Sequence, residues 1–203
     1  MIAEMICIFD MGGVLVRNHN VFPALSRYLG FDESCHSFAD FGKEVSDSLR
    51  LYSEGRISEN EFWTVFSSVT GKHIEDDGES LFGRFFKPVI DDPTEAVIKE
   101  LKGRGIRVVC GTNVIKEHYD VHIALSQYCV FDKVYPSFRM HLNKPDQEFF
   151  RYIIEKGGVL PEECFFTDDL IDNVASAESV GMHSYLYSDA ETLEKNLRKE
   201  KLL

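Results

Sequence analysis

Polar side chains suited to phosphate chemistry lie in four short segments that are far apart in the chain. They are Asp10, Thr112, Asn113, Lys144, Asp168 and Asp169. Three crowded carboxylates repel one another unless a cation lies between them, and carboxylate and phosphate oxygens are the ligands that Mg²⁺ prefers. The hydroxyl, the amide and the lysine supply donors for phosphoryl oxygens, and phosphoryl transfer depends mainly on positioning and charge neutralisation. The set therefore predicts a magnesium-dependent phosphoryl-transfer site.

Two glycines extend the first of these segments. Gly12 and Gly13 follow Asp10 at short distance in the chain. Glycine lets the backbone come close to a ligand, and successive backbone N–H groups can point at phosphate oxygens. We therefore expect both glycines to belong to the phosphate-binding part of the site.

Bringing the four segments together requires a parallel sheet, which the apolar runs of the chain predict. The predicted strands are Met5–Phe9, Val108–Cys110, Val130-Phe131 with Val134-Tyr135, Cys164–Phe166 and Ser184–Tyr187. Continuous apolar runs are typical of strands buried on both faces, and their alternation with helical patterns indicates an α/β fold with a doubly wound, Rossmann-like parallel sheet. Ligands of such sheets bind at the carboxyl ends of the strands, where the polar segments begin.

Helix signals lie between the predicted strands. Asp92 as N-cap and Pro93 at the first helical position predict a helix that ends near Gly103. Pro145 predicts the start of another helix, which ends at Gly157-Gly158. These helices would connect successive parallel strands.

Residues 17–90 interrupt this alternation. They contain no clear strand, and their apolar side chains recur at helical spacing, as in Phe62, Val65 and Phe66. We expect an all-helical cap at 17–90, inserted into a core formed by residues 1–16 and 91–203. The acidic run Glu75–Asp77 lacks the alternating oxygen ligands of a calcium loop, so we expect a solvated helix end there.

Composition limits the partners and the compartment. The 203 residues carry a formal net charge of −12, which argues against a nucleic-acid-binding surface. No apolar run is long enough to span a membrane, and Met1–Glu4 has no basic segment typical of a signal peptide. The five cysteines form no C-x-x-C pair, which favours buried free thiols. We expect a cytoplasmic protein that acts on a small phosphorylated metabolite; its oligomeric state is left open.

The four polar segments also resemble the motifs of the haloacid dehalogenase superfamily. The matching stretches, in the order of that superfamily, are Phe9–Val14, Thr112-Asn113, Lys144-Pro145 and Phe166–Asn173. The insert at 17–90 is similar to the helical cap that members carry between the first two motifs. Tyr52–Phe62 in the cap and His118 after the second motif resemble the sugar-phosphate phosphatases, such as glucose-1-phosphate phosphatase.

The resemblance implies a mechanism and a role for each site residue. Asp10 would attack phosphorus and form an aspartyl-phosphate, which water would hydrolyse. Mg²⁺ would be held by Asp10, the Gly12 carbonyl and Asp169, with Asp168 binding it directly or supporting those that do. Thr112, Asn113 and Lys144 would hold the phosphoryl group.

One position departs from the pattern of the superfamily. Its phosphatases usually carry a second Asp two residues after the nucleophile, which protonates the leaving oxygen, and here that position is Gly12. General acid–base catalysis is typically worth ~10²–10⁴-fold in rate. A different donor such as His118 or a cap residue, a good leaving group, or a slow enzyme would each account for the loss.

Three alternative interpretations compete with a sugar-phosphate phosphatase. A haloacid dehalogenase also lacks the second Asp, but its chemistry needs no metal and this chain keeps the acidic pair Asp168-Asp169. A non-catalytic phosphate-binding protein could use the same scaffold. His118 and His122 have the spacing of zinc ligands, although no Cys or Glu partner is evident.

Overall fold

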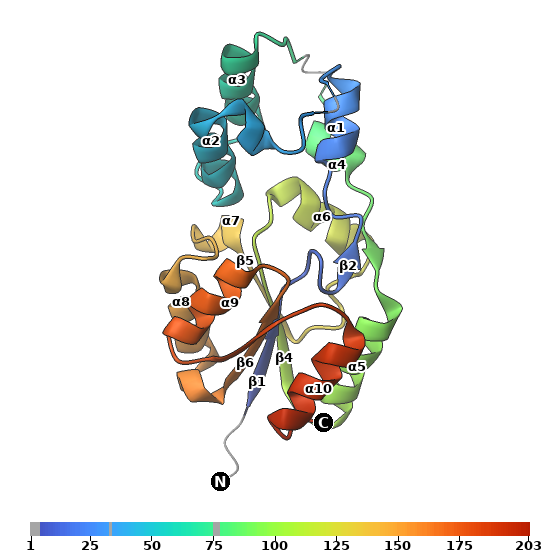
Figure 1. Cartoon of the computed structure of the whole chain (residues 1–203), viewed down its shortest axis with the longest axis vertical. Helices are drawn as coiled ribbons and strands as arrows, with labels where there is room; N and C mark the ends of the chain where they lie inside the picture. The colour runs from blue at the N-terminus through green and yellow to red at the C-terminus, as the bar shows by residue number, and fades with distance from the viewer. Residues whose placement is uncertain (1–4, 33, 75–77) are drawn as a thin grey trace.

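A computed structural model describes residues 5–32, 34–74 and 78–203 (Figure 1). The predicted solvated helix end at Glu75–Asp77 lies outside the described residues. Five parallel strands form the main sheet, in the order β5-β4-β1-β6-β7. Their bounds are β1 Ile6–Phe9, β4 Arg107–Thr112, β5 Lys133–Pro136, β6 Cys164–Asp168 and β7 His183–Leu186. The predicted α/β, Rossmann-like fold is confirmed.

Helices cover both faces of this sheet, which explains the continuous apolar runs. Side chains of β1 alternate between two apolar clusters: Cys7 and Phe9 pack in one, and Ile6 and Ile8 in the other. One face is covered by α5 (Asp92–Gly103) and α10 (Ala190–Lys199), and the other by α8 (Gln147–Gly157) and α9 (Ile171–Ser179). Burial on both faces leaves only the strand ends for polar side chains.

Two predicted helix starts are off by one or two residues. The N-cap of α5 is Asp91 rather than Asp92, because its side chain accepts a hydrogen bond from the backbone N–H of Thr94. Pro145 does not open α8: its peptide bond with Lys144 is cis, and the helix starts at Gln147. The predicted end of α8 is confirmed, with Gly158 in the left-handed conformation (φ 65°) as its C-cap.

The third strand also differs from its prediction. β5 contains Val134 and Tyr135, but Val130-Phe131 lie in the turn before it. Phe131 is nevertheless buried in the core, where its ring centroid lies 6.5 Å from that of Phe9. Burial alone therefore made this turn resemble a strand in the sequence.

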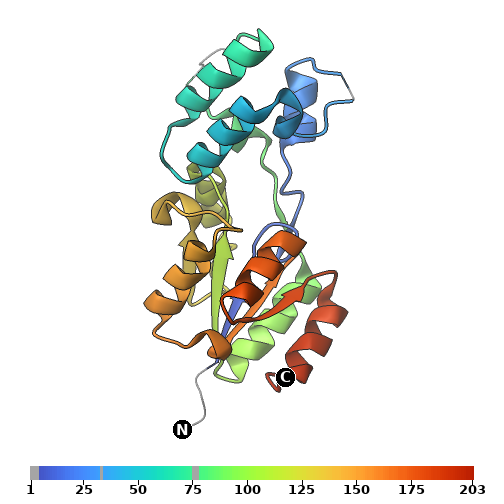
Figure 2. The ribbon, with the colours of Figure 1, turned by 60° about the vertical axis from the view of Figure 1, so that its left-hand side comes forward.

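The segment between β1 and α5 forms a helical cap above the carboxyl ends of the strands (Figures 1 and 2). It contains α1 Phe22–Tyr28, a short 3₁₀ helix Phe38–Phe41, α2 Lys43–Ser53, α3 Glu59–Thr70 and α4 Leu81–Phe85. Aromatic rings fill its core: Phe62 has its ring centroid 5.3 Å from that of Phe38 and 5.4 Å from that of Phe82. The cap therefore has a hydrophobic core of its own.

A two-stranded ribbon joins the cap to the sheet. β2 (Val16–Arg17) pairs antiparallel with β3 (Val89–Ile90). The sequence indicated no strand in 17–90, because two-residue strands are too short for a periodic pattern. We propose the ribbon as the boundary between a core of residues 1–16 and 91–203 and a cap of residues 17–90.

Two further expectations concern compartment. Within the described ranges, no helix combines the length and the apolar character needed to cross a membrane. Cys7, Cys110 and Cys164 are buried free thiols as expected, but Cys129 is an exposed free thiol and Cys35 is half-buried. A cytoplasmic location stays a prediction.

Phe62→Ala tests the aromatic core of the cap. Phe62 is completely buried, so its truncation leaves a cavity and should lower the free energy of unfolding by about 3–5 kcal/mol. Urea unfolding followed by tryptophan fluorescence measures this loss, because the only tryptophan of the chain, Trp63, lies in this core. Val69→Ala on the exposed side of α3 is the control and should change stability by less than about 0.5 kcal/mol. Equal losses in both variants would contradict the described packing.

Candidate active site

The carboxyl ends of three neighbouring strands bring the predicted polar residues together. Asp10 directly follows β1, which pairs with β4 on one side and β6 on the other. Thr112 is the last residue of β4 and is buried, and Asp168 is the last residue of β6. Lys144 reaches the same point from the loop between α7 (Ser137–Met140) and α8. All four predicted segments therefore converge on one edge of the sheet.

Lys144 holds two of the carboxylates together. Its Nζ donates hydrogen bonds to Asp10 Oδ1 and to Asp168 Oδ2, each at 2.6 Å, and to the Gly111 carbonyl at 2.9 Å. The lysine side chain is 1% exposed. Charge-assisted bonds of this length are strong, and removing one member of a buried group leaves an uncompensated charge. Lys144 therefore fixes the position of the Asp10 carboxylate.

One lysine does not neutralise three carboxylates. Burial raises the pKa of Asp10, and the charge of Asp168 raises it further against the opposing effect of Lys144. Burial and then Asp168 likewise raise the pKa of Asp169. Burial by itself lowers the pKa of Lys144, but Asp10 and Asp168 outweigh it, so the pKa is raised and the lysine stays charged. The remaining negative charge favours a bound cation.

The carboxylates are close enough to share that cation. Ligand oxygens of Asp10, Asp168 and Asp169 all lie within 4.8 Å of one another. Asp168 has both oxygens occupied: Oδ2 binds Lys144, and Oδ1 accepts hydrogen bonds of 2.9 Å from the Leu170 N–H and from Asn173 Nδ2. Asp10 and Asp169 therefore have more oxygen lone pairs free for a metal than Asp168 has. An all-oxygen donor set of this kind fits Mg²⁺.

Gly13 makes room for Asp169. A Cβ atom on Gly13 would lie 2.1 Å from Asp169 Oδ2, and the φ of this glycine is +80°, which side chains rarely adopt. Gly12 has a different neighbour: a Cβ there would lie 3.2 Å from the ring of His19. His19 thus borders the position at which related phosphatases carry their second Asp. The sequence did not predict this contact, because it depends on the path of the chain between Gly12 and His19.

The contacts of the Asn113 side chain differ from the predicted one, which was with phosphate. Its Nδ2 donates to the Lys144 carbonyl and its Oδ1 accepts from the Lys144 N–H, both at 2.8 Å. Both polar atoms of its side chain are therefore used to position the backbone of Lys144. A contact between this side chain and phosphate stays a prediction.

The two histidines of α6 (Lys116–Ala124) do not form a metal site. His122 Nδ1 lies 2.6 Å from Gln127 Oε1, and the ring of His118 stacks on Phe86 with centroids 3.7 Å apart. Among the residues that the structure describes, Asp10, Asp168 and Asp169 form the only group of three or more potential ligands close enough to hold a metal. Burial lowers the pKa of His118 to about 3, so this ring is neutral near pH 7 and is a poor general acid.

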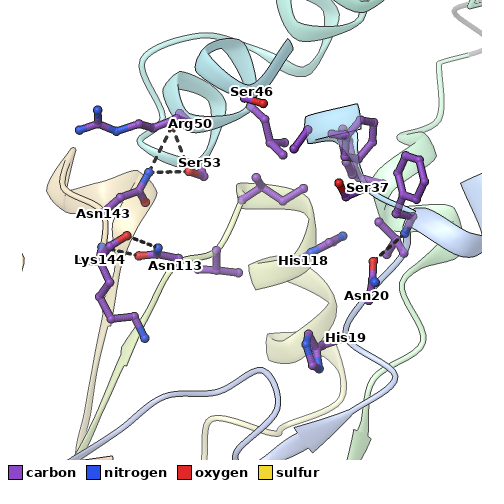
Figure 3. A pocket seen from close by; sticks show the side chains of 18 of the residues that line it. His19, Asn20, Ser37, Ser46, Arg50, Ser53, Asn113, His118, Asn143 and Lys144 are labelled. Atoms are coloured by element: carbon purple, nitrogen blue, oxygen red, sulfur yellow. Dashed lines mark hydrogen bonds between the residues drawn. The ribbon is translucent and has the colours of Figure 1, made fainter. Parts of the chain in front are cut away.

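The cap closes over this site through contacts that sequence reasoning missed. Ser137 Oγ in α7 donates to the Ser53 carbonyl at the end of α2 (2.7 Å), and Asn143 Nδ2 donates to Ser53 Oγ (2.7 Å). A Cβ on Gly55 would lie 2.3 Å from the Phe138 carbonyl, so the glycine in the Tyr52–Phe62 stretch permits this close approach. A cavity of about 850 Å³ remains between cap and core, lined among others by His19, His118, Asn113 and Lys144 (Figure 3).

Comparison with known proteins identifies the family that has this arrangement. The sequence profile of the haloacid dehalogenase-like hydrolases matches residues 5–181, which include the carboxylates and Lys144. The chain belongs to the haloacid dehalogenase-like hydrolase family. A structure of a family enzyme from Bacteroides thetaiotaomicron, in complex with magnesium and inorganic phosphate, superposes with a TM-score of 0.67 and 21% identity over 92% of this chain and 95% of that chain. That enzyme, which shares the fold of this chain, thus holds magnesium and inorganic phosphate together.

Three relatives of this chain are named for different activities. It is 24% identical to a sesquiterpene phosphatase of Aspergillus oryzae, over 95% of this chain and 94% of that protein. It is 23% identical to a D-ribitol-5-phosphate phosphatase of Bacteroides thetaiotaomicron, over 88% and 89% of the two chains. It is 27% identical to a drimenol cyclase of Aspergillus calidoustus over 72% of this chain, which corresponds to 28% of that protein.

Gly13→Ala tests the metal-binding part of the hydrolase site. The new methyl group would displace the Asp169 carboxylate, so Mg²⁺ affinity measured by calorimetry and catalytic rate should each fall by ~10²-fold. Gly42→Ala is a matched control, because its φ is also positive (+98°) but its Cβ would meet nothing within 4 Å. If Gly13→Ala binds Mg²⁺ as the wild type does, Asp169 is not a ligand.

The buried neutral His118 predicts a pH dependence of stability. In the unfolded chain His118 takes up a proton near pH 6.5, whereas in the folded chain its pKa is about 3. The unfolded state therefore binds more protons between these values, and the free energy of unfolding falls as the pH decreases through this window. Between about pH 7 and pH 5 this histidine should account for about 2 kcal/mol of the loss. His118→Gln should reduce the loss by that amount in urea unfolding at the two pH values.

The same substitution at exposed His73 is the control and should leave the pH-dependent loss as in the wild type. An undiminished loss in His118→Gln would contradict the burial of this imidazole.

Proposed function

We propose that this hydrolase is a Mg²⁺-dependent phosphatase that cleaves a small phosphate monoester through a phosphorylated Asp10. The observation that carries the proposal is the position of the Asp10 carboxylate, held at 2.6 Å by Lys144 beside Asp168 and Asp169. The Asp10 carboxylate is buried, its orientation is fixed by Lys144, and the neighbouring carboxylates leave a net negative charge. Such a carboxylate is suited to act as a nucleophile beside a bound cation.

The residues of the site have separate roles in the reaction. An Asp10 oxygen attacks phosphorus in line, the bond from phosphorus to the ester oxygen breaks, and the ester oxygen leaves as an alcohol with a proton taken from solvent. Water then attacks phosphorus and gives up a proton to solvent, the bond from phosphorus to the Asp10 oxygen breaks, and inorganic phosphate and the Asp10 carboxylate are released. Asp10, Asp169 and the Gly12 carbonyl would hold Mg²⁺, which would supply positive charge to the phosphoryl oxygens. Lys144 and the hydroxyl of Thr112 face the same group.

Two classes of leaving group are supported by the relatives. The sequence predicts a sugar phosphate, and the D-ribitol-5-phosphate phosphatase among the relatives supports that class. A second relative is named a sesquiterpene phosphatase, which supports a hydrocarbon-rich substrate instead. These two names indicate different leaving groups, so the lining of the cavity bears on the choice between them.

Asp10→Asn tests the nucleophile. Phosphate release from an aryl phosphate with Mg²⁺ should fall at least ~10³-fold, because the amide cannot form the phosphorylated intermediate. Asp47→Asn, on the exposed side of α2, is the control and should keep wild-type activity. In the wild type, EDTA should abolish turnover, and mass spectrometry of acid-quenched enzyme should detect one added phosphoryl group on the peptide that contains Asp10.

Three results would contradict this function. Turnover that survives Asp10→Asn would exclude the nucleophile, and turnover that survives EDTA would exclude the metal. Metal-independent halide release from 2-haloacids, without phosphate release from any ester, would support a dehalogenase instead.

A further inference from the structure

We infer that the leaving group of the substrate is an apolar hydrocarbon and that the cavity between cap and core binds it. This inference rests on the proposed phosphatase function and adds the chemical class of the substrate. It also gives a physical ground for deciding between the two classes that the relatives suggest.

The walls of the cavity are mainly hydrocarbon. Six of the large side chains that line it come from both the cap and the core: Phe22, Phe38, Leu49, Phe82, Val114 and Ile115. Its volume of about 850 Å³ is at the upper end of the range that encloses small organic ligands. Burial of an apolar chain against such walls gains affinity roughly in proportion to the area removed from water.

Most polar side chains around the cavity already have partners within the protein. Asn20 Oδ1 accepts from the Phe22 N–H (3.0 Å), both polar atoms of Asn113 bind the backbone of Lys144, and Ser46 Oγ donates to the Gly42 carbonyl (3.1 Å). Figure 3 shows Asn20, Asn113 and Asn143 directed toward these internal partners. These groups are therefore occupied before a substrate arrives.

The positively charged residues that line the cavity also have partners within the protein. Arg50 forms ion pairs with Glu54 (3.0 Å) and Asp146 (2.7 Å), and Lys144 binds the two carboxylates at the phosphoryl end. Among the described residues that line the cavity, the buried polar atoms without a partner are His118 Nε2 and Asn143 Oδ1. These two atoms and the exposed side chain of His19 are few partners for a sugar phosphate, which carries several hydroxyl groups. Each hydroxyl buried without a partner costs ~10-fold or more in affinity.

The cavity lies next to the reacting end of the site. Lys144 lines the cavity and also holds Asp10, and His19 lines it while bordering Gly12. A phosphoryl group at Asp10 would therefore have its leaving group directed toward the apolar walls. Hydrogen bonds between the cap and α7 keep those walls in place around it.

A series of matched phosphate esters tests the inference with the full-length protein and Mg²⁺. For ethyl, pentyl and decyl phosphate, kcat/KM should rise with chain length by up to ~4-fold for each methylene group that becomes buried. Pentyl phosphate should exceed a pentitol phosphate of the same chain length by ~10-fold or more. The reverse preference, or values that do not change with chain length, would overturn the inference while an active aryl phosphate assay leaves the phosphatase function intact.

A pair of leucines on α2 provides the matched variants. Leu49→Asn places an amide in the cavity wall and should flatten the dependence on chain length. Leu51→Asn makes the same change on the same helix, at an exposed position outside the cavity, and should leave the dependence unchanged. A steep dependence that survives in Leu49→Asn would show that the chain binds elsewhere.

Binding to the inactive enzyme separates the two proposals. Calorimetry on Asp10→Asn with Mg²⁺ should give affinities for the alkyl phosphates that increase from ethyl to decyl, whether or not the wild type turns them over. An increase without turnover would contradict the phosphatase function alone. Affinities that do not depend on chain length would overturn the apolar leaving group.

Discussion

A buried lysine that is shared by two carboxylates is the constraint on which the site depends. Lys144 is enclosed at the end of the central strand and lies 2.6 Å from both Asp10 and Asp168. Charges of this kind are costly to bury unless each is paired and hydrogen-bonded. The surrounding contacts meet that condition, because Asn113 holds the lysine backbone and Asn173 holds the second oxygen of Asp168.

This pairing also explains which carboxylates remain available for chemistry. Both oxygens of Asp168 accept hydrogen bonds from its neighbours, which fix the position of this carboxylate. Asp10 and Asp169 retain oxygens that face the same space, and Gly13 leaves that space open. The protein thus maintains an excess of negative charge where a cation and a phosphoryl group can restore the balance.

The cap covers this strand edge and bounds the cavity beside it. Its aromatic core is independent of the sheet, and it is attached through the β2–β3 ribbon and through hydrogen bonds between α2 and α7. The same attachment places apolar cap side chains opposite the phosphoryl end. Closure therefore sets both the exclusion of water and the chemistry of the leaving group.

Sequence reasoning was most accurate where one residue pattern determines one feature. Buried runs followed by polar residues predicted β1, β4 and β6 and the convergence of the site, since strand ends at one edge of a parallel sheet must meet. It was less accurate where two residues could serve equally, as with Asp91 and Asp92 at the start of α5. It could not find the contact between His19 and Gly12, which depends on packing between distant elements.

A crystal structure grown at millimolar Mg²⁺ is the most direct test of the carboxylate cluster. We predict density for a cation in contact with Asp10 and Asp169, while Lys144 stays bonded to Asp168. A cluster that remains without a cation under these conditions, or a cation bound only at another place, would contradict the account.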